Sequence, residues 1–161
     1  MPHLRSILAS GSLLLVLGGT SSLWKHRAGS AARESKASCG SAIECQRTAN
    51  AAFGAEMARV GTDCTNVRNQ REEDSCESEA AAGTERNFSV FYSALESIVG
   101  SDALDDSEQA WLDYRKKQCV AVFDFFRPGT IAPSAALRCK VELTRSRMRD
   151  LDSLFETALH H

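Results

Sequence analysis

The chain has 161 residues, six cysteines and a formal net charge of −2 at pH 7. That length accommodates one domain together with an export segment. The slightly acidic charge balance argues against a nucleic-acid-binding protein, because such proteins carry a basic face. We therefore expect no nucleic-acid partner.

Residues 1–21 predict a signal peptide. Arg5 gives a positive start, an apolar stretch runs from Ile7 to Leu17, and small residues follow from Gly19 to Ser22. The apolar stretch is shorter than the roughly 20 residues that a membrane-spanning helix needs. We expect a periplasmic or secreted protein without a stable membrane span after cleavage, and a noncleaved anchor is the alternative.

The mature chain is predicted to begin with a polar, flexible lead-in over residues 22–38, followed by a single domain over residues 39–161. All six cysteines belong to that domain: Cys39, Cys45, Cys64, Cys76, Cys119 and Cys139. An even number in an exported chain favours disulfides, although the residues alone leave their connectivity open. Structural zinc is the competing interpretation, but no C-x2-C motif occurs, and we expect no metal site.

Apolar residues at helical spacing predict four helical stretches. The first runs from Ser41 to Val60. The second begins before Cys76, is interrupted around Gly83 and ends at Gly100. The third follows an N-cap at Ser107 and is broken by the sequence Arg127-Pro128-Gly129, and the last runs through Leu137, Val141, Met148 and Ala158. No useful strand alternation appears, so the predicted fold is a small all-α bundle of three to four helices stapled by disulfides.

The third helix carries an apolar stripe that we interpret as its inward face: Trp111, Tyr114, Cys119, Val122 and Phe126. Arg115 lies beside this stripe. A half-buried Arg is usually held by a carboxylate or by carbonyl groups, so its expected role is architectural, and direct contact with a partner is the alternative. Gln109 and Arg147 are expected in the same polar seam.

The pattern Q-x-x-W-[LI]-x-[YF]-R-x-x-x-C, followed by a distant Cys and T-x-x-R-x-x-x-L, resembles the LprI N-terminal-like family over residues 64–155. The matching residues are Gln109, Trp111, Leu112, Tyr114, Arg115, Cys119, Cys139, Thr144, Arg147 and Leu151. The resemblance implies a secreted helical domain with disulfide bridges Cys64–Cys76 and Cys119–Cys139. Cys39 and Cys45 then remain to form the third bridge. It also implies a lysozyme inhibitor.

Catalysis is not expected. No His lies between His26 and His160 to act as a base, the exported cysteines are expected to be oxidised, and no cofactor-binding motif occurs. Two acidic runs, 72–79 and 102–108, are interpreted as solvated surface or, alternatively, as docking sites for a basic target.

The loop from Arg127 to Ser134 is the predicted contact with a protein partner, through Arg127, Pro128 and Ile131. Ordering of this loop by the Cys119–Cys139 bridge would lower the entropy lost on binding. Two functions are compatible with these observations. One is an exported, non-enzymatic binding protein of the lysozyme-inhibitor type, and the alternative is a periplasmic structural or accessory module with another ligand or protein partner.

Overall fold

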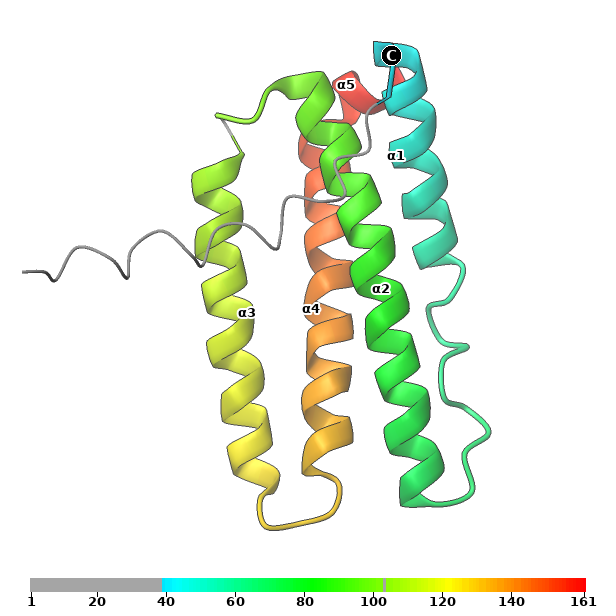
Figure 1. The fold of residues 1–161 in the computed structure, drawn as a ribbon, viewed down its shortest axis with the longest axis vertical. Helices are drawn as coiled ribbons and strands as arrows, with labels where there is room; N and C mark the ends of the chain where they lie inside the picture. The colour runs from blue at the N-terminus through cyan, green and yellow to red at the C-terminus, as the bar shows by residue number, and fades with distance from the viewer. Residues whose placement is uncertain (1–38, 103) are drawn as a thin grey trace, which may run out of the picture. The chain divides into compact units, whose positions relative to one another are not determined.

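The computed structural model describes residues 39–102 and 104–161, so the predicted signal peptide and lead-in lie outside the described residues. Within those ranges the chain forms helices and no strand: α1 Ala42–Met57, α2 Gln70–Val99, α3 Asp105–Phe126, α4 Ala132–Leu154 and α5 Glu156–His160 (Figure 1). The predicted all-α fold is confirmed. Its three to four helices correspond to α1–α4, and α5 is an additional short helix.

Side-chain caps set the starts of the first two helices. Ser41 accepts a hydrogen bond from the backbone N–H of Glu44 at 3.3 Å, and Asn69 accepts one from Glu72 at 3.0 Å. Gly100 ends α2 with a φ of 94°, which a residue with a Cβ rarely adopts. The predicted interruption at Gly83 is wrong, because α2 continues through it. Gly83 is buried against the side chain of Arg59, and a Cβ there would collide with that guanidinium.

The ends of α3 and α4 differ from the prediction in two places. Ser107 is not the N-cap of α3. It lies in the first helical turn, and its hydroxyl donates to the carbonyl of Leu104 at 2.9 Å. The helix α4 begins at Ala132 and includes Pro133, because a proline in the first turn removes an N–H that has no helical partner anyway. The loop between α3 and α4 is therefore limited to residues 127–131, and the last helix breaks at Phe155 before α5 begins.

The helices α1–α5 belong to one compact unit. In this unit α1 packs on α2, α2 packs on α4, and α4 packs on α3 (Figure 1). The described backbones of α2 and α3 do not approach each other closely, so these two helices flank α4. The short α5 packs across α1, α2 and α4.

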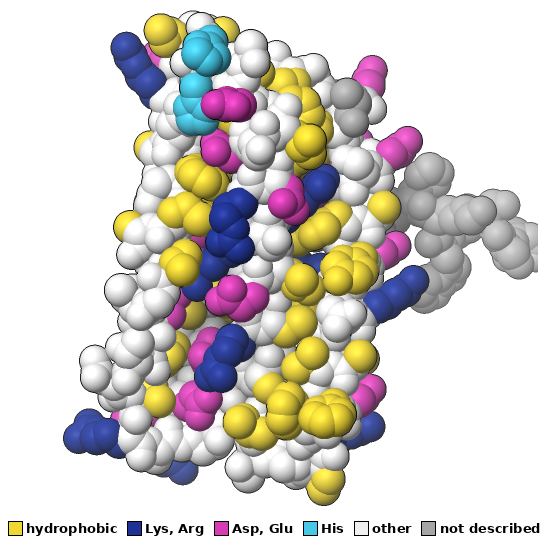
Figure 2. Space-filling view, turned by 180° about the vertical axis from the view of Figure 1, so that it is seen from behind, with side chains coloured by type: hydrophobic (Ala, Val, Ile, Leu, Met, Phe, Trp, Pro, Cys, Tyr) yellow, Lys and Arg dark blue, Asp and Glu magenta, His cyan; other side chains and the backbone are white. Residues whose placement is uncertain are grey.

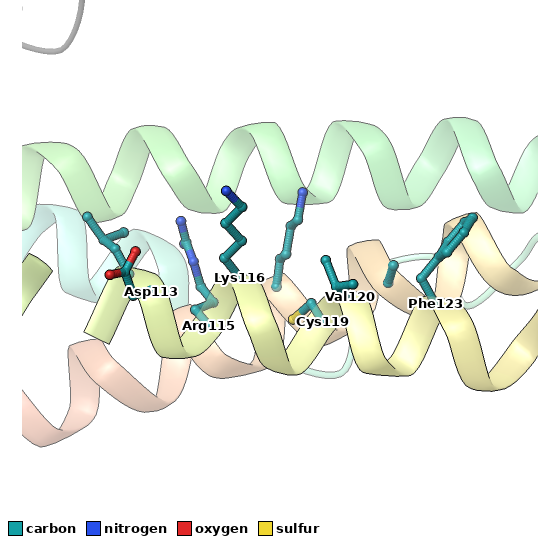
Figure 3. Close-up of a pocket in the computed structure, with 9 residues that line it drawn as sticks. Asp113, Arg115, Lys116, Cys119, Val120 and Phe123 are labelled. Carbon is teal, nitrogen blue, oxygen red and sulfur yellow. The ribbon is translucent and has the colours of Figure 1, made fainter. Parts of the chain in front are cut away.

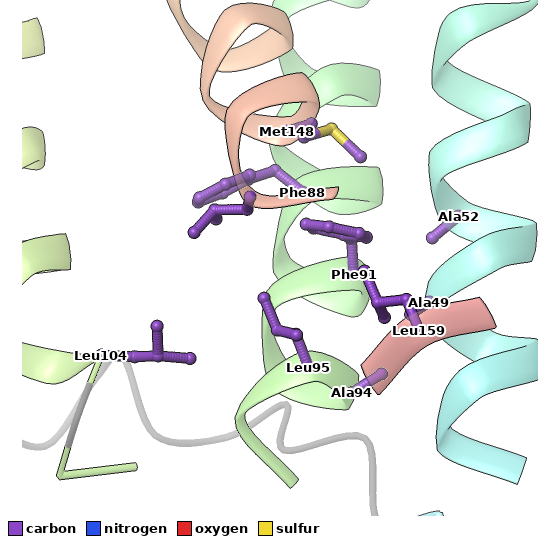
Figure 4. Packing of buried hydrophobic residues seen from close by; sticks show 10 residues of the cluster. Ala49, Ala52, Phe88, Phe91, Ala94, Leu95, Leu104, Met148 and Leu159 are labelled. Carbon is purple, nitrogen blue, oxygen red and sulfur yellow. The ribbon is translucent and has the colours of Figure 1, made fainter. Parts of the chain in front are cut away.

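The main hydrophobic core lies where α1, α2, α4 and α5 meet (Figure 4). Its largest fully buried side chains are Phe91, Leu95, Met148, Leu151 and Leu159. Ala49 and Ala52 face this cluster from α1, and these small side chains allow close approach of α1 to α2. The core thus stabilises the end of the bundle where the chain terminates.

The helix α3 is more exposed than its stripe predicts. Tyr114 is 52% exposed and Phe126 is 39% exposed, so the prediction that both face inward is wrong. Trp111 is half-buried and packs on Phe88 with ring centroids 5.4 Å apart. Because α3 packs closely along α4 and reaches α2 through side chains such as Trp111, a narrow seam of its surface is covered.

Three cysteine pairs connect these elements: Cys39–Cys45, Cys64–Cys76 and Cys119–Cys139, with Cα–Cα distances of 5.2, 5.7 and 5.6 Å. They are the pairs that the family resemblance implies. The first encloses the start of α1, and the second joins the α1–α2 connection to α2. The third links α3 to α4 and buries Cys119.

Candidate functional site

The motif residues of α3 and α4 meet in one seam around the indole of Trp111. The guanidinium carbon of Arg115 lies 4.8 Å from the ring centroid, and that of Arg147 lies 5.9 Å from it. Arg115 donates to Glu85 of α2 at 2.6 Å and to the hydroxyl of Thr144 at 2.7 Å. This Arg therefore connects α3 to both neighbouring helices, as expected for an architectural residue.

Arg147 extends the seam toward the start of α3. It donates to Glu108 at 3.3 Å and to the hydroxyl of Ser107 at 3.3 Å. Burial raises the pKa of Glu108 above its ordinary value, and the nearby positive charge of Arg147 opposes that rise. Burial, together with the charge of Glu108, also raises the pKa of Tyr92.

Three other motif positions lie elsewhere. Gln109 is exposed and outside the seam, so the prediction that it joins Arg147 there is wrong. Leu151 belongs to the main core. Leu112 lines a groove on the surface, described below. The motif thus contributes to three different parts of the fold.

A buried network of charged residues, which the sequence interpretation missed, links α1, α2 and α4. Glu56 is 0% exposed and Arg145 is 3% exposed, and Arg145 donates to Glu56 at 2.8 Å. Arg145 also pairs with Asp63. Arg59 donates to both carboxylates, at 3.2 Å to Glu56 and 3.3 Å to Asp63. Two carboxylates therefore face two guanidinium groups, and their charges balance.

Neutral donors complete the coordination of Glu56. The hydroxyl of Thr84 donates to it at 2.7 Å and the amide of Asn87 at 2.8 Å. One signal in the sequence could have identified this buried network. Arg145 lies between Val141 and Met148 on the inward stripe of α4. A charge at such a position requires a buried partner.

Part of the first acidic run is bound by a basic residue of α4. Arg138 donates to Glu77 at 2.9 Å and to Glu73 at 2.7 Å, and Glu77 is buried. The interpretation of this run as solvated surface is therefore wrong at these two residues. On the face of the molecule that Figure 2 shows, basic and acidic side chains alternate in a column, and hydrophobic side chains gather beside it.

The end of the α3–α4 hairpin exposes apolar side chains. We name Phe125, Phe126 and Ile131 the hairpin tip; they are 81%, 39% and 39% exposed. The rings of Phe125 and Phe126 meet edge to face with centroids 5.1 Å apart. Of the predicted contact residues, Arg127, Pro128 and Ile131 all lie in this loop, and Arg127 pairs with Asp124 at 3.1 Å.

A groove of about 590 Å³ runs beside the tip, between α3 and α4. We name it the α3 groove. Its apolar lining comes from Leu112, Cys119, Val120, Phe123 and Ala136, and its charged lining comes from Asp113, Arg115, Lys116 and Lys140. The side chains of Lys116 and Val120 point from α3 toward α2 (Figure 3). The groove is therefore lined by α3 and α4 and opens on the side of α3 that faces α2.

Within residues 39–102 and 104–161, two kinds of feature are absent. No three His, Cys, Asp or Glu residues in that part of the chain gather into a group that could hold a metal ion. None of its helices is both long enough and apolar enough to cross a membrane.

Comparison with known proteins identifies a family. The model of the family described as lysozyme inhibitor LprI matches residues 62–151, more than half of the chain. An uncharacterized protein of Rhizobium meliloti (strain 1021) is 37% identical over 57 residues, which cover 35% of this chain and 41% of the relative. The match thus spans less than half the length of that curated relative. No solved structure matches the chain significantly.

Proposed function

We propose that this chain, which belongs to the lysozyme inhibitor LprI family, is an exported, non-enzymatic protein that binds lysozyme and inhibits it. The family match carries the proposal. The predicted signal peptide and the three cysteine pairs support export to the periplasm or the exterior, because disulfides persist in oxidising compartments.

The proposed contact surface is the hairpin tip together with Arg127 and Pro128. Large apolar side chains that remain exposed mark interaction sites when they lie together. The Cys119–Cys139 bridge and the pairing of Arg127 with Asp124 hold the hairpin in one arrangement. A pre-ordered loop loses less conformational entropy when it binds, which raises affinity.

The test measures the lysis of a peptidoglycan suspension by egg-white-type lysozyme in the presence of the purified, oxidised protein. We expect lysis to slow in proportion to the protein added. Phe125→Asp should weaken inhibition by at least about tenfold, because it places a charge in the apolar centre of the contact.

A matched control is available at the other end of the hairpin. Leu154 is 72% exposed near the end of α4, so Leu154→Asp makes the same chemical change away from the tip. This variant should inhibit as the unaltered protein does. Unchanged lysis rates with the unaltered protein would refute lysozyme inhibition, and equal losses in both variants would refute the tip as the contact surface.

The α3 groove favours a second candidate function, a periplasmic accessory module that takes another ligand. Its volume and its largely apolar lining are typical of small-molecule sites. A protein that leaves lysozyme fully active but binds a ligand in this groove would have the second function.

A further inference from the structure

The α3 groove has an apolar lining and two lysines without a partner. Among the described residues, the side-chain ammonium groups of Lys116 and Lys140 form no ion pair and no hydrogen bond, although the backbone carbonyl of Lys140 accepts from Thr144. Arg115 also lines the groove, but its guanidinium is already bound to Glu85 and Thr144. The lysines are therefore the cations available to a ligand.

The two ends of the groove differ in character, since one is crossed by an ion pair and the other is apolar. The ion pair between Arg115 and Glu85 spans from α3 to α2, and Val120, Phe123 and Ala136 lie farther toward the loop between α3 and α4. From Leu112 to Phe123 the helix rises by about 17 Å, at 1.5 Å per residue. A ligand along this groove would meet cations in its middle and carbon atoms beyond them.

We propose that the α3 groove binds a single-chain anionic amphiphile, that is, a fatty-acid-type molecule with a carboxylate head and one acyl chain. The carboxylate lies between Lys116 and Lys140, and the chain covers Val120, Phe123 and Ala136. Charge complementarity selects the head group, since Asp113 offsets one of the two lysines and the lining keeps a net positive charge. The acyl chain buries apolar lining that is otherwise in water.

This site is separate from the hairpin tip, so the inference does not depend on lysozyme binding. Phe125 points its 81% exposed ring into solvent and does not line the groove. Loss of amphiphile binding and loss of lysozyme inhibition can therefore be measured in different variants.

The test is calorimetric titration of the full, oxidised chain with dodecanoate below its micelle-forming concentration. We expect binding of one molecule per chain. Dodecyltrimethylammonium, which has the same chain and a cationic head, should bind at least about tenfold more weakly, because a charge-assisted hydrogen bond is lost and replaced by repulsion.

Variants locate the binding. Lys116→Ala combined with Lys140→Ala should weaken dodecanoate binding by at least about tenfold, and Val120→Trp should block it by filling the groove. Lys117→Ala is the matched control, since Lys117 neighbours Lys116 but does not line the groove. Thermal unfolding of each variant checks that it folds.

Three results would overturn the proposal. These are the absence of dodecanoate binding to the unaltered chain, an equal loss in Lys117→Ala, and binding by Val120→Trp that equals binding by the unaltered chain. A preference for the cationic amphiphile would overturn the assignment of the lysines as well.

Discussion

At the scale of single residues, the pair of Glu56 and Arg145 shows how strongly one contact ties distant parts of the chain. The two residues are 89 positions apart and join α1 to α4 in the interior. Removing one partner of a buried ion pair leaves an uncompensated charge, and this costs more than the pair itself contributes.

Arg145→Ala is therefore expected to lower the free energy of unfolding by about 3 to 5 kcal/mol. Urea denaturation, monitored by circular dichroism, measures this change in the free energy of unfolding. Arg149→Ala is the matched control, because Arg149 lies one turn further along α4, is exposed and, among the described residues, donates to the sulfur of Met57 and to no carboxylate. Similar losses in the two variants would contradict the central role of the buried network.

At the scale of elements, α3 is the helix with the least coverage. Only Glu108 and Cys119 are buried among its residues, whereas α2 buries nine. The position of α3 therefore depends on the seam around Trp111 and on the bridge between Cys119 and Cys139.

Replacing Cys119 and Cys139 together by Ser should lower the stability of the oxidised protein by about 2 to 4 kcal/mol. The comparison is the double replacement of Cys39 and Cys45. That bridge spans 6 residues and the Cys119–Cys139 bridge spans 20, and the constraint on the unfolded chain grows with the length of the closed loop. Thermal unfolding measures the stability of both variants. A larger loss of stability in the Cys39/Cys45 variant, which lacks the bridge that closes the shorter loop, would contradict this account.

At the scale of the whole molecule, the stretch that defines the family is smaller than the packed unit. Residues 62–151 contain α2, α3 and most of α4 but exclude α1 and α5. The excluded helices supply Glu56 to the buried network and Ala49, Ala52 and Leu159 to the main core.

We expect a fragment of residues 62–151 to lack cooperative unfolding, because Arg145 would lose its buried partner and Phe91 would lose the cover of α1. The fragment of residues 39–161 is the control and should unfold in one sharp transition. Scanning calorimetry of both fragments decides the matter. A sharp transition in the shorter fragment would show that α1 and α5 are accessory to the fold.

The sequence by itself determined the helical class, the division into helices near Gly61, Gly100 and Pro128, and the expectation that a carboxylate holds Arg115. These features depend on local periodicity, on backbone geometry and on one charge beside an apolar stripe, all of which are readable over a few residues. A motif of definite spacing gave the resemblance to the family, and that resemblance implied the cysteine pairs. Which helix packs against which could not be predicted from such local patterns.

Only the tertiary structure decided which face of each helix is covered. Tyr114 lies on the same periodic stripe as Cys119, yet it is exposed because the close packing of α3 is on α4, and α3 reaches α2 through side chains such as Trp111 and Arg115. Arg145 lies on the inward stripe of α4, but its partner Glu56 is identified only when α1 and α4 are brought together. The physical reason is common to both cases: periodicity defines a face, whereas burial and charge pairing depend on the helix that lies against that face.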